Sequence, residues 1–339
     1  MNNLKMRVLL LFNFLVLVQA CFANQVNFLE SLLDSDTMDI PRIIFDTDIG
    51  SDCDDAGALA VLHNLANKQE AKILGVVYSS NANVHGSTAC AEINSFFGRP
   101  NLLLGEYRGS VVIGDPRDSY TGYLANIYDK ANGLHKNERL ELVVAYKKML
   151  ENQPKKSVTI VTVGHPVGLF YLMCDREGRK LVEEKVKSWV AMTHTDTTPK
   201  NDWNFGKNGS DVYISGLLKL WPTAVYFSGA GQDVITGKSL LPKTSIVNPV
   251  RHSYELWGNN ALKNGRSSWD QIAVLFAIRP QLFDLENGEL RQNDDFETFW
   301  TDADGDDKVS RNHFKVLPKL KNTELAELIE ALMVLEPGN

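Results

Sequence analysis

The stretch IIFDTDIGSDCDDAGALAVL, residues 43–62, decides the fold, because it joins an apolar strand to an apolar helix through a loop rich in aspartate. Residues 43–45 are apolar, five of the next ten residues are aspartates, and a mostly apolar helical pattern follows. In open α/β sheets, ligands bind outside the carboxyl ends of the strands. The stretch therefore predicts a ligand site where a buried strand ends.

Strand and helix patterns alternate along the rest of the chain. Short apolar runs rich in β-branched residues predict strands over residues 42–45, 71–79, 158–163, 188–192 and 223–228. Helical patterns lie among them over residues 54–67, 87–97, 138–151, 166–174 and 211–220. This order predicts an α/β fold with an open, mostly parallel sheet flanked by helices. Further helices are expected over residues 249–263, 269–277 and 323–335, with a hairpin around residues 302–305.

Each expected strand is followed by polar residues or glycine. The five segments read Asp46-Thr47-Asp48, Ser79-Ser80-Asn81, Gly164-His165, Thr193-His194 and Gly229-Ala230-Gly231. Loops after strands are commonly polar, so one such segment alone carries little weight. Together they predict a polar crevice at one edge of the sheet.

The aspartate-rich loop predicts a site for a hard cation. Two carboxylates about 4 Å apart repel by about 4 kcal/mol at an effective dielectric constant of 20. Several of them after a buried strand therefore need a cation or raised pKa values. Ca²⁺ takes six to eight oxygen ligands, which suits this loop better than metals that select thiols or imidazoles. The alternative is a set of helix-capping or solvated surface carboxylates.

The loop resembles the fingerprint of the nucleoside hydrolase family, in which D-x-D-x-G after a strand is followed by D-D-A before an apolar helix. Three residues, Ser51-Asp52-Cys53, separate Gly50 from the paired aspartates here, whereas the commonest form of the family has one. The resemblance implies the Rossmann-like nucleoside hydrolase fold, Ca²⁺ as cofactor, and hydrolysis of the N-glycosidic bond of ribonucleosides or related N-ribosides. The longer spacing resembles a divergent, exported branch.

The resemblance also implies roles for individual residues. Asp48 would be a calcium ligand and the general base that activates water, and Asp55, Asp270 and the carbonyl of Val163 would be the other ligands. Similar segments are residues 159–165, 202–205 and 268–271, and together the matches cover roughly residues 41–278. The residues implied to bind substrate are Asp54, Asn83, Met192, Asp202, Trp203, Asn204 and Trp269.

Several of these residues have plainer readings. Asn81 matches the pattern nearly as well as Asn83, and either could cap the helix that follows. Asp202 and Asn204 are also typical turn residues, and Asp270 is typical of a helix cap.

Protonation of the leaving group is not explained by the resemblance. Some relatives have a histidine directly before the distal aspartate, where this chain has Trp269. His85, His165 and His194 follow expected strands and are candidate proton donors. Alternatively, a basic purine would leave after protonation by solvent, with Trp203 or Trp269 stacked on it.

Two other functions fit parts of the sequence. Asp46-x-Asp48 after a strand resembles haloacid-dehalogenase-type phosphatases, although Gly50 stands where that family has Thr or Val. A secreted protein that binds ribosyl groups or sugars with little turnover is the second alternative. An EF-hand at residues 302–307 is excluded, because Gly305 falls at the fourth place and no glutamate closes the loop.

The amino-terminal residues are typical of an exported protein. Lys5 and Arg7 precede an apolar run at residues 8–18, as in a secretory signal peptide. Cleavage is expected after Ala20 or Ala23, and residues 17–21 loosely resemble a lipobox in which Cys21 would carry a lipid anchor. We expect a periplasmic, secreted or lipid-anchored protein. Its organisation would be a signal peptide at 1–23, a leader at 24–40 and a single domain at 41–339.

Composition limits the partners. Hydrophobic residues make up 44% and charged residues 23%, as in ordinary globular proteins. Removing Lys5 and Arg7 with the signal peptide changes the net charge from −7 to −9. No run of Lys and Arg is present, so we expect no nucleic-acid partner. Cys53, Cys90 and Cys174 form no CxxC pair and are expected to be isolated buried thiols. We therefore expect a small nucleoside or N-riboside as partner, and the sequence leaves a homo-oligomer open.

Overall fold

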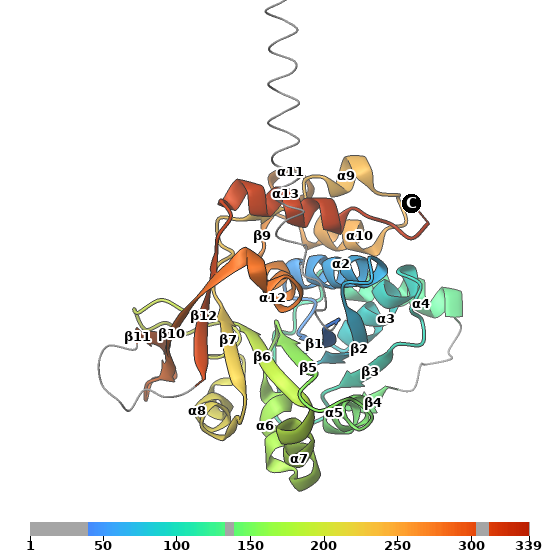
Figure 1. Ribbon diagram of the computed structural model, residues 1–339. Coiled ribbons are helices and arrows are strands. Elements are labelled where there is room, and N and C mark those ends of the chain that lie inside the picture. The colour runs from blue at the N-terminus through green and yellow to red at the C-terminus, as the bar shows by residue number, and fades with distance from the viewer. Residues whose placement is uncertain (1–39, 133–138, 303–311, 339) are drawn as a thin grey trace, which may run out of the picture. The chain divides into compact units, whose positions relative to one another are not determined.

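The computed structural model describes residues 40–132, 139–302 and 312–338 (Figure 1). A ten-stranded sheet forms its centre, in the order β11-β10-β12-β7-β6-β5-β1-β2-β3-β4. Every neighbouring pair from β12 to β4 is parallel, and the two pairs that β10 forms, with β11 and β12, are antiparallel. The predicted α/β fold with an open, mostly parallel sheet is confirmed.

The five predicted strands form the middle of the sheet. They are β1 (Arg42–Thr47), β2 (Lys72–Tyr78), β5 (Val158–Thr162), β6 (Val186–Met192) and β7 (Ala224–Ser228). Ile43, Ile44 and Phe45 in β1 are completely buried, because helices cover both faces of the sheet. A strand buried on both faces is apolar throughout, which explains why the sequence pattern identified these strands.

The remaining strands lie at the two edges and were not predicted. β3 (Leu103–Glu106) and β4 (Leu140–Glu141) form one edge, and β10 (Phe283–Gln292), β11 (Thr298–Asp302) and β12 (His313–Pro318) extend the other. The predicted turn at residues 303–305 lies outside the described residues. β11 and β12, on either side of it, each pair with β10 rather than with each other.

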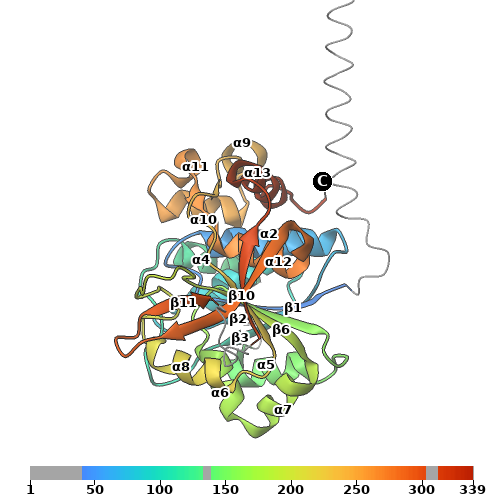
Figure 2. The ribbon, with the colours of Figure 1, turned by 60° about the vertical axis from the view of Figure 1, so that its left-hand side comes forward.

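Helices form a layer on each side of the sheet (Figures 1 and 2). One layer holds α5 (Leu142–Leu150), α6 (Val167–Cys174), α7 (Arg176–Lys185) and α8 (Asp211–Leu220). The other holds α2 (Asp54–Asn67), α3 (Gly86–Phe96), α4 (Thr121–Asn132) and α12 (Trp269–Ile278). Beyond α2 lie α9 (Leu240–Lys243), α10 (Pro249–Trp257), α11 (Ala261–Asn264) and α13 (Asn322–Met333).

Several expected features differ in detail. The predicted helix at 249–263 is interrupted by residues 258–260, and the one expected from residue 138 starts at Leu142, after β4. Cys53 and Cys90 are buried thiols as expected, but Cys174 is exposed. Among the described residues, no helix is long and apolar enough to cross a membrane. The proposed signal peptide and leader fall almost entirely outside the described residues.

Helix α2 is buried along nearly its whole length, because α12 and α13 pack on it. One of its buried side chains is His63, whose Nε2 lies 2.8 Å from the amide oxygen of Asn94. The imidazole also stacks on Phe97, with ring centroids 5.0 Å apart. Burial lowers the pKa of His63 to about 3, so the folded protein keeps this ring neutral.

We expect His63→Gln to weaken the loss of stability in acid. Between about pH 6.5 and pH 3 only the unfolded state protonates His63, so its contribution to the free energy of unfolding falls as pH decreases. The maximum slope is about 1.4 kcal/mol per pH unit. Urea unfolding of both proteins between neutral and moderately acidic pH measures it. Parallel stability curves for wild type and variant would contradict this assignment.

Candidate active site

The carboxyl ends of β1, β2, β5, β6 and β7 meet at one edge of the sheet, where a pocket of about 450 Å³ opens. The pocket is lined by residues far apart in sequence, including Asp52, Met192, Trp203, Arg266 and Trp269. A parallel sheet brings these loops together because every parallel strand ends on the same side. Of the five polar segments predicted to meet there, Thr193-His194 and Gly229 line this pocket, whereas Asp46-Thr47-Asp48, Ser79-Ser80-Asn81 and Gly164-His165 do not.

Three carboxylates converge beneath this pocket. One oxygen from each of Asp52, Asp55 and Asp270 lies within 4.8 Å of the others. Asp55 is in the first turn of α2 and Asp270 in the first turn of α12, so the packing of these two helices joins distant parts of the chain. Asp52 was not predicted as part of this group. It belongs to the longer spacing between Gly50 and the paired aspartates.

Asp48 is not one of the three carboxylates within 4.8 Å of one another, but it lies near Asp55 and is buried against a histidine. Its Oδ2 is 3.2 Å from Nε2 of His165, and both side chains are buried. Burial lowers the pKa of His165, but the Asp48 carboxylate, together with the Asn204 carbonyl and Asp46, raises it above its usual value. The Asp48 carboxylate thus favours the protonated form of His165.

Two glycines allow the loops around Asp48 to approach each other. Gly50 has φ of +136°, and a Cβ there would lie 2.6 Å from Nδ2 of Asn83. A Cβ on Gly164 would lie 2.4 Å from the backbone nitrogen of Asp48. Larger residues at either position would displace the loop that carries Asp48.

Burial leaves the carboxylates poorly compensated. Burial, followed by the neighbouring carboxylates, raises the pKa values of Asp54, Asp55 and Asp270 well above their usual range. Asp54 Oδ2 and Asp270 Oδ1 are buried without a hydrogen-bond partner among the described residues. An oxygen-coordinating divalent cation would neutralise these groups and use the free oxygen of Asp270, so the side chains fit such an ion.

Asp46, the first aspartate of the loop, has a different role. Its carboxylate accepts a hydrogen bond from the hydroxyl of Tyr146 in α5. Burial raises the pKa of Asp46 to about 7, against the effect of its hydrogen bonds. Asp46 therefore anchors the end of β1 to the helix layer below it.

Asp202 and Asn204 shape the wall beside the carboxylates. Asp202 Oδ1 accepts hydrogen bonds from Thr193 Oγ1 and from the backbone nitrogens of Asn204 and Phe205, at 2.9–3.0 Å, and Oδ2 accepts one from the nitrogen of His194. Asn204 Nδ2 donates to the carbonyl of Val163 at 2.7 Å. Within the described chain, Asn204 Oδ1 is buried and unpartnered, so it is available to a ligand.

Asn83 is placed differently from the other predicted substrate residues. Its Nδ2 donates to Thr121 Oγ1 at 2.7 Å and to the carbonyl of Arg117 at 3.0 Å, and its Oδ1 accepts from the nitrogen of His85. Asn81 holds the same connecting segment through Gly109, Val111 and Ile113. Both asparagines thus brace the segment before α4, and neither lines the 450 Å³ pocket.

Arg266 is a site residue that was not predicted from the sequence. It lies in the short strand β9 (Arg266–Ser267), which pairs with β8 (Ile235–Thr236). Its Nη2 donates to Asp52 Oδ2 at 2.6 Å, and its Nε is 3.3 Å from Asp54 Oδ1. The guanidinium lies over the rings of Trp257 and Trp269, 4.9 and 4.7 Å from their centroids. The unusual loop spacing that introduces Asp52 was the only available hint.

The three candidate proton donors occupy different surroundings. His165 is completely buried against Asp48, and His85 is exposed beside Asp118. His194 lines the pocket, with its Nε2 2.9 Å from the carbonyl of Thr198. Of the three, only His194 lines the pocket where a leaving group would lie.

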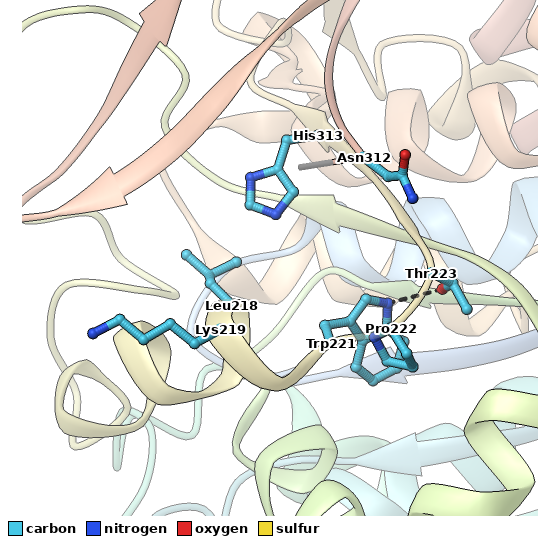
Figure 3. Close-up of a pocket in the computed structure, with 7 residues that line it drawn as sticks. All are labelled: Leu218, Lys219, Trp221, Pro222, Thr223, Asn312 and His313. Atoms are coloured by element: carbon cyan, nitrogen blue, oxygen red, sulfur yellow. Dashed lines mark hydrogen bonds between the residues drawn. The ribbon is translucent and has the colours of Figure 1, made fainter. Parts of the chain in front are cut away.

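A second pocket, of about 270 Å³, lies at the amino-terminal ends of the parallel strands, where β7 and β12 begin (Figure 3). It is lined by the end of α8, residues 221–223 and the start of β12, and Trp221 Nε1 donates to Thr223 Oγ1 at 3.0 Å. Its lining lacks carboxylates, which distinguishes it from the site above the aspartate loop.

Solved structures share this fold. An inosine-uridine preferring nucleoside hydrolase from Bacillus anthracis matches with a TM-score of 0.66 and 14% identity, over 87% of this chain and 99% of that chain. A purine-preferring ribonucleoside hydrolase from Gardnerella vaginalis gives 0.63 and 12%, over 86% and 98%. The type III effector protein XopQ, complexed with adenosine diphosphate ribose, gives 0.60 and 11%, over 91% and 96%. No family model and no curated protein matches the sequence. The chain therefore has the fold of nucleoside hydrolases, as the resemblance implied.

We expect Asp270→Asn to stabilise the protein when divalent ions are removed. The substitution replaces a buried carboxylate whose pKa is raised by burial and by its neighbours, so it relieves their repulsion. Calorimetry in EDTA near neutral pH should show a melting temperature about 3 °C higher than that of wild type. The exposed Asp284→Asn is the matched control and should change nothing. A lower melting temperature for Asp270→Asn in EDTA would show that the carboxylate is compensated without an ion.

Proposed function

We propose that the protein is a calcium-dependent N-ribohydrolase that cleaves the N-glycosidic bond of ribonucleosides or related N-ribosides and releases base and ribose. The observation that carries the proposal is the meeting of Asp55 and Asp270 near Asp48, with buried carboxylate oxygens unpartnered in the described residues. This meeting lies at the ligand-binding edge of a sheet with the nucleoside hydrolase fold.

Asp48, Asp55, Asp270 and the carbonyl of Val163 are the groups we propose to hold the ion. All are oxygen donors, which favours Ca²⁺ over metals that prefer nitrogen or sulfur. Asn204 donates to the Val163 carbonyl and so fixes its direction, and the second lone pair of that oxygen stays available. When bound, Ca²⁺ would orient the vicinal hydroxyls of a pentose and acidify water.

Asp48 is the proposed general base. It accepts a proton from water as the water oxygen forms a bond to the anomeric carbon. The bond between that carbon and the base nitrogen breaks, its electron pair passes to the base, and a proton from solvent completes the free base. The transition state resembles an oxocarbenium ion, so the surrounding carboxylates stabilise its positive charge. His165 Nε2 lies 3.2 Å from Asp48 Oδ2, and we propose that it helps to position this carboxylate.

The remaining predicted residues provide for substrate binding. Asp54 Oδ2 and Asn204 Oδ1 are both buried and unpartnered within the described residues, and we propose that they bind ribose hydroxyls. Met192 and Trp203 line the pocket beside the sugar. Trp269 lines the same pocket directly before Asp270, so we propose that it stacks on the base. Asp202 and Asn83 contribute indirectly, because their hydrogen bonds hold the loops around the site in place.

A ribosyl-binding protein with little turnover is the second candidate. Trp269 stands where the resemblance implies a leaving-group histidine, and Arg266 covers one part of that indole. An effector protein complexed with adenosine diphosphate ribose shares the fold. A substrate that loses an easily protonated base would need no histidine to protonate it. The tryptophan at residue 269 is therefore compatible with hydrolysis as well as with binding.

The site of action is also a proposal. The signal-like segment at residues 1–23 supports an exported protein that acts in the periplasm or outside the cell, with Cys21 as a candidate lipid anchor. Nucleosides or N-ribosides outside the cytoplasm would then be its substrates.

We expect calcium chelation and Asp48→Asn each to abolish release of base. Without Asp48 no group accepts the proton of water, so the rate should fall at least about 100-fold. Chromatography of purine and pyrimidine nucleosides, with and without Ca²⁺, measures the released base. Asp284→Asn, at an exposed strand position, should retain full activity. Asp48→Asn should keep its circular dichroism spectrum.

Hydrolysis by Asp48→Asn at the wild-type rate would show that another group activates water. If wild type releases no base but Ca²⁺ and ribose raise its melting temperature together, the ribosyl-binding function is the correct one.

A further inference from the structure

Positively charged side chains line the mouth of the active-site pocket. Arg117, Lys200, Lys207 and Arg266 all border it. Ribose and the common bases carry no negative charge at neutral pH, so hydrolysis of a plain nucleoside does not require this lining.

Two of these cations are not neutralised by the protein. Arg266 is balanced by Asp52 and Asp54, and Arg117 is paired with Asp115. In contrast, Lys200 and Lys207 are exposed and have no carboxylate within ion-pair distance in the described part of the chain. Of the pocket carboxylates, Asp202 is saturated by hydrogen bonds and Asp196 points largely into solvent.

Arg117 and Lys207 gather at Trp203. The guanidinium carbon of Arg117 lies 5.4 Å, and Nζ of Lys207 4.8 Å, from the centroid of the indole. The indole holds the two cations near each other by cation–π attraction. Trp203 directly precedes Asn204, whose buried Oδ1 has no partner among the described residues. The cations therefore flank the segment that we assign to the sugar.

We infer that the pocket accepts ribosides that carry a phosphate on the sugar, with Lys207 and Arg117 binding the phosphate. The inference rests on the proposed function. If the ion binds the ribose diol and Trp269 stacks on the base, the remaining substituent of the pentose is its exocyclic carbon, C5′. Its phosphate would lie beside Trp203. Charge-assisted hydrogen bonds from Lys and Arg are suited to a phosphate dianion. The substrate class is nucleoside 5′-monophosphates and other 5′-phosphorylated N-ribosides.

The pocket adjoins the carboxylate group through Asp52, which belongs to both, so an anionic ligand needs nearby cations. Asp48, Asp52, Asp54, Asp55 and Asp270 would repel an approaching phosphate even with one divalent ion bound. Cations at the mouth offset this repulsion and raise the local concentration of an anionic ligand. A binding site for neutral nucleosides alone has no such need.

Calorimetry with ribose and ribose 5-phosphate in saturating Ca²⁺ tests the inference without requiring turnover. We expect ribose 5-phosphate to bind at least about tenfold more tightly at low salt, because it adds ion pairs to the same sugar contacts. The advantage should disappear near about 0.5 M NaCl, where charges are screened over a few ångströms. Lys207→Gln combined with Arg117→Gln should abolish it, whereas Lys219→Gln, at an exposed position beside the opposite pocket, should retain it.

Hydrolysis assays separate this inference from the function on which it rests. Adenosine and inosine are compared with their 5′-monophosphates, and the phosphorylated forms should have the lower KM. Release of base from nucleosides, with no preference for ribose 5-phosphate or the monophosphates, would overturn the phosphate site and leave the hydrolase. Tight binding of ribose 5-phosphate that depends on Lys207, without any hydrolysis, would support the phosphate site and refute turnover.

Discussion

Repulsion among buried carboxylates is the constraint on which the rest of this structure depends. Asp55 and Asp270 lie in the first turns of α2 and α12, and the packing of these helices leaves neither carboxylate in water. Helix amino termini favour negative charge, but each contributes only about 1 kcal/mol, less than a buried charge costs. The buried carboxylates that would bind a ligand therefore destabilise the fold. A bound divalent cation would compensate their charge.

The longer spacing in the loop adds a third carboxylate to this group, together with a cation that pairs with it. Asp52 joins Asp55 and Asp270, and Arg266 binds Asp52 from β9. Trp257 and Trp269 hold the guanidinium from its faces, so the cation cannot leave without losing both rings. The longer spacing supplies Asp52, and Trp269 helps to hold the arginine that pairs with it. The charge of the additional aspartate is thus partly compensated.

The sequence predicted those parts of the molecule where burial produces a strong pattern. β1, β2, β5, β6 and β7 are covered on both faces, so their apolar runs revealed them, and the aspartates after β1 located the site. β10 is largely exposed and rich in charged residues, so it has no strand pattern. Arg266 and Lys207 could not be found from spacing, because only the folded chain brings β9 and the segment after β6 to the same pocket. Asn83 fitted the pattern, yet its amide is already bound by the chain.

The pocket lining carries charges of both signs: Asp52 belongs to the carboxylate group with Asp55 and Asp270, and Lys200, Lys207 and Arg117 line the same pocket. This arrangement favours a ligand that presents a diol to the carboxylate group and an anion to the lysines. A ligand with the opposite polarity would meet repulsion at both ends. Because electrostatic complementarity governs orientation as well as encounter, the same charges that admit a phosphorylated riboside also direct its glycosidic bond toward Asp48.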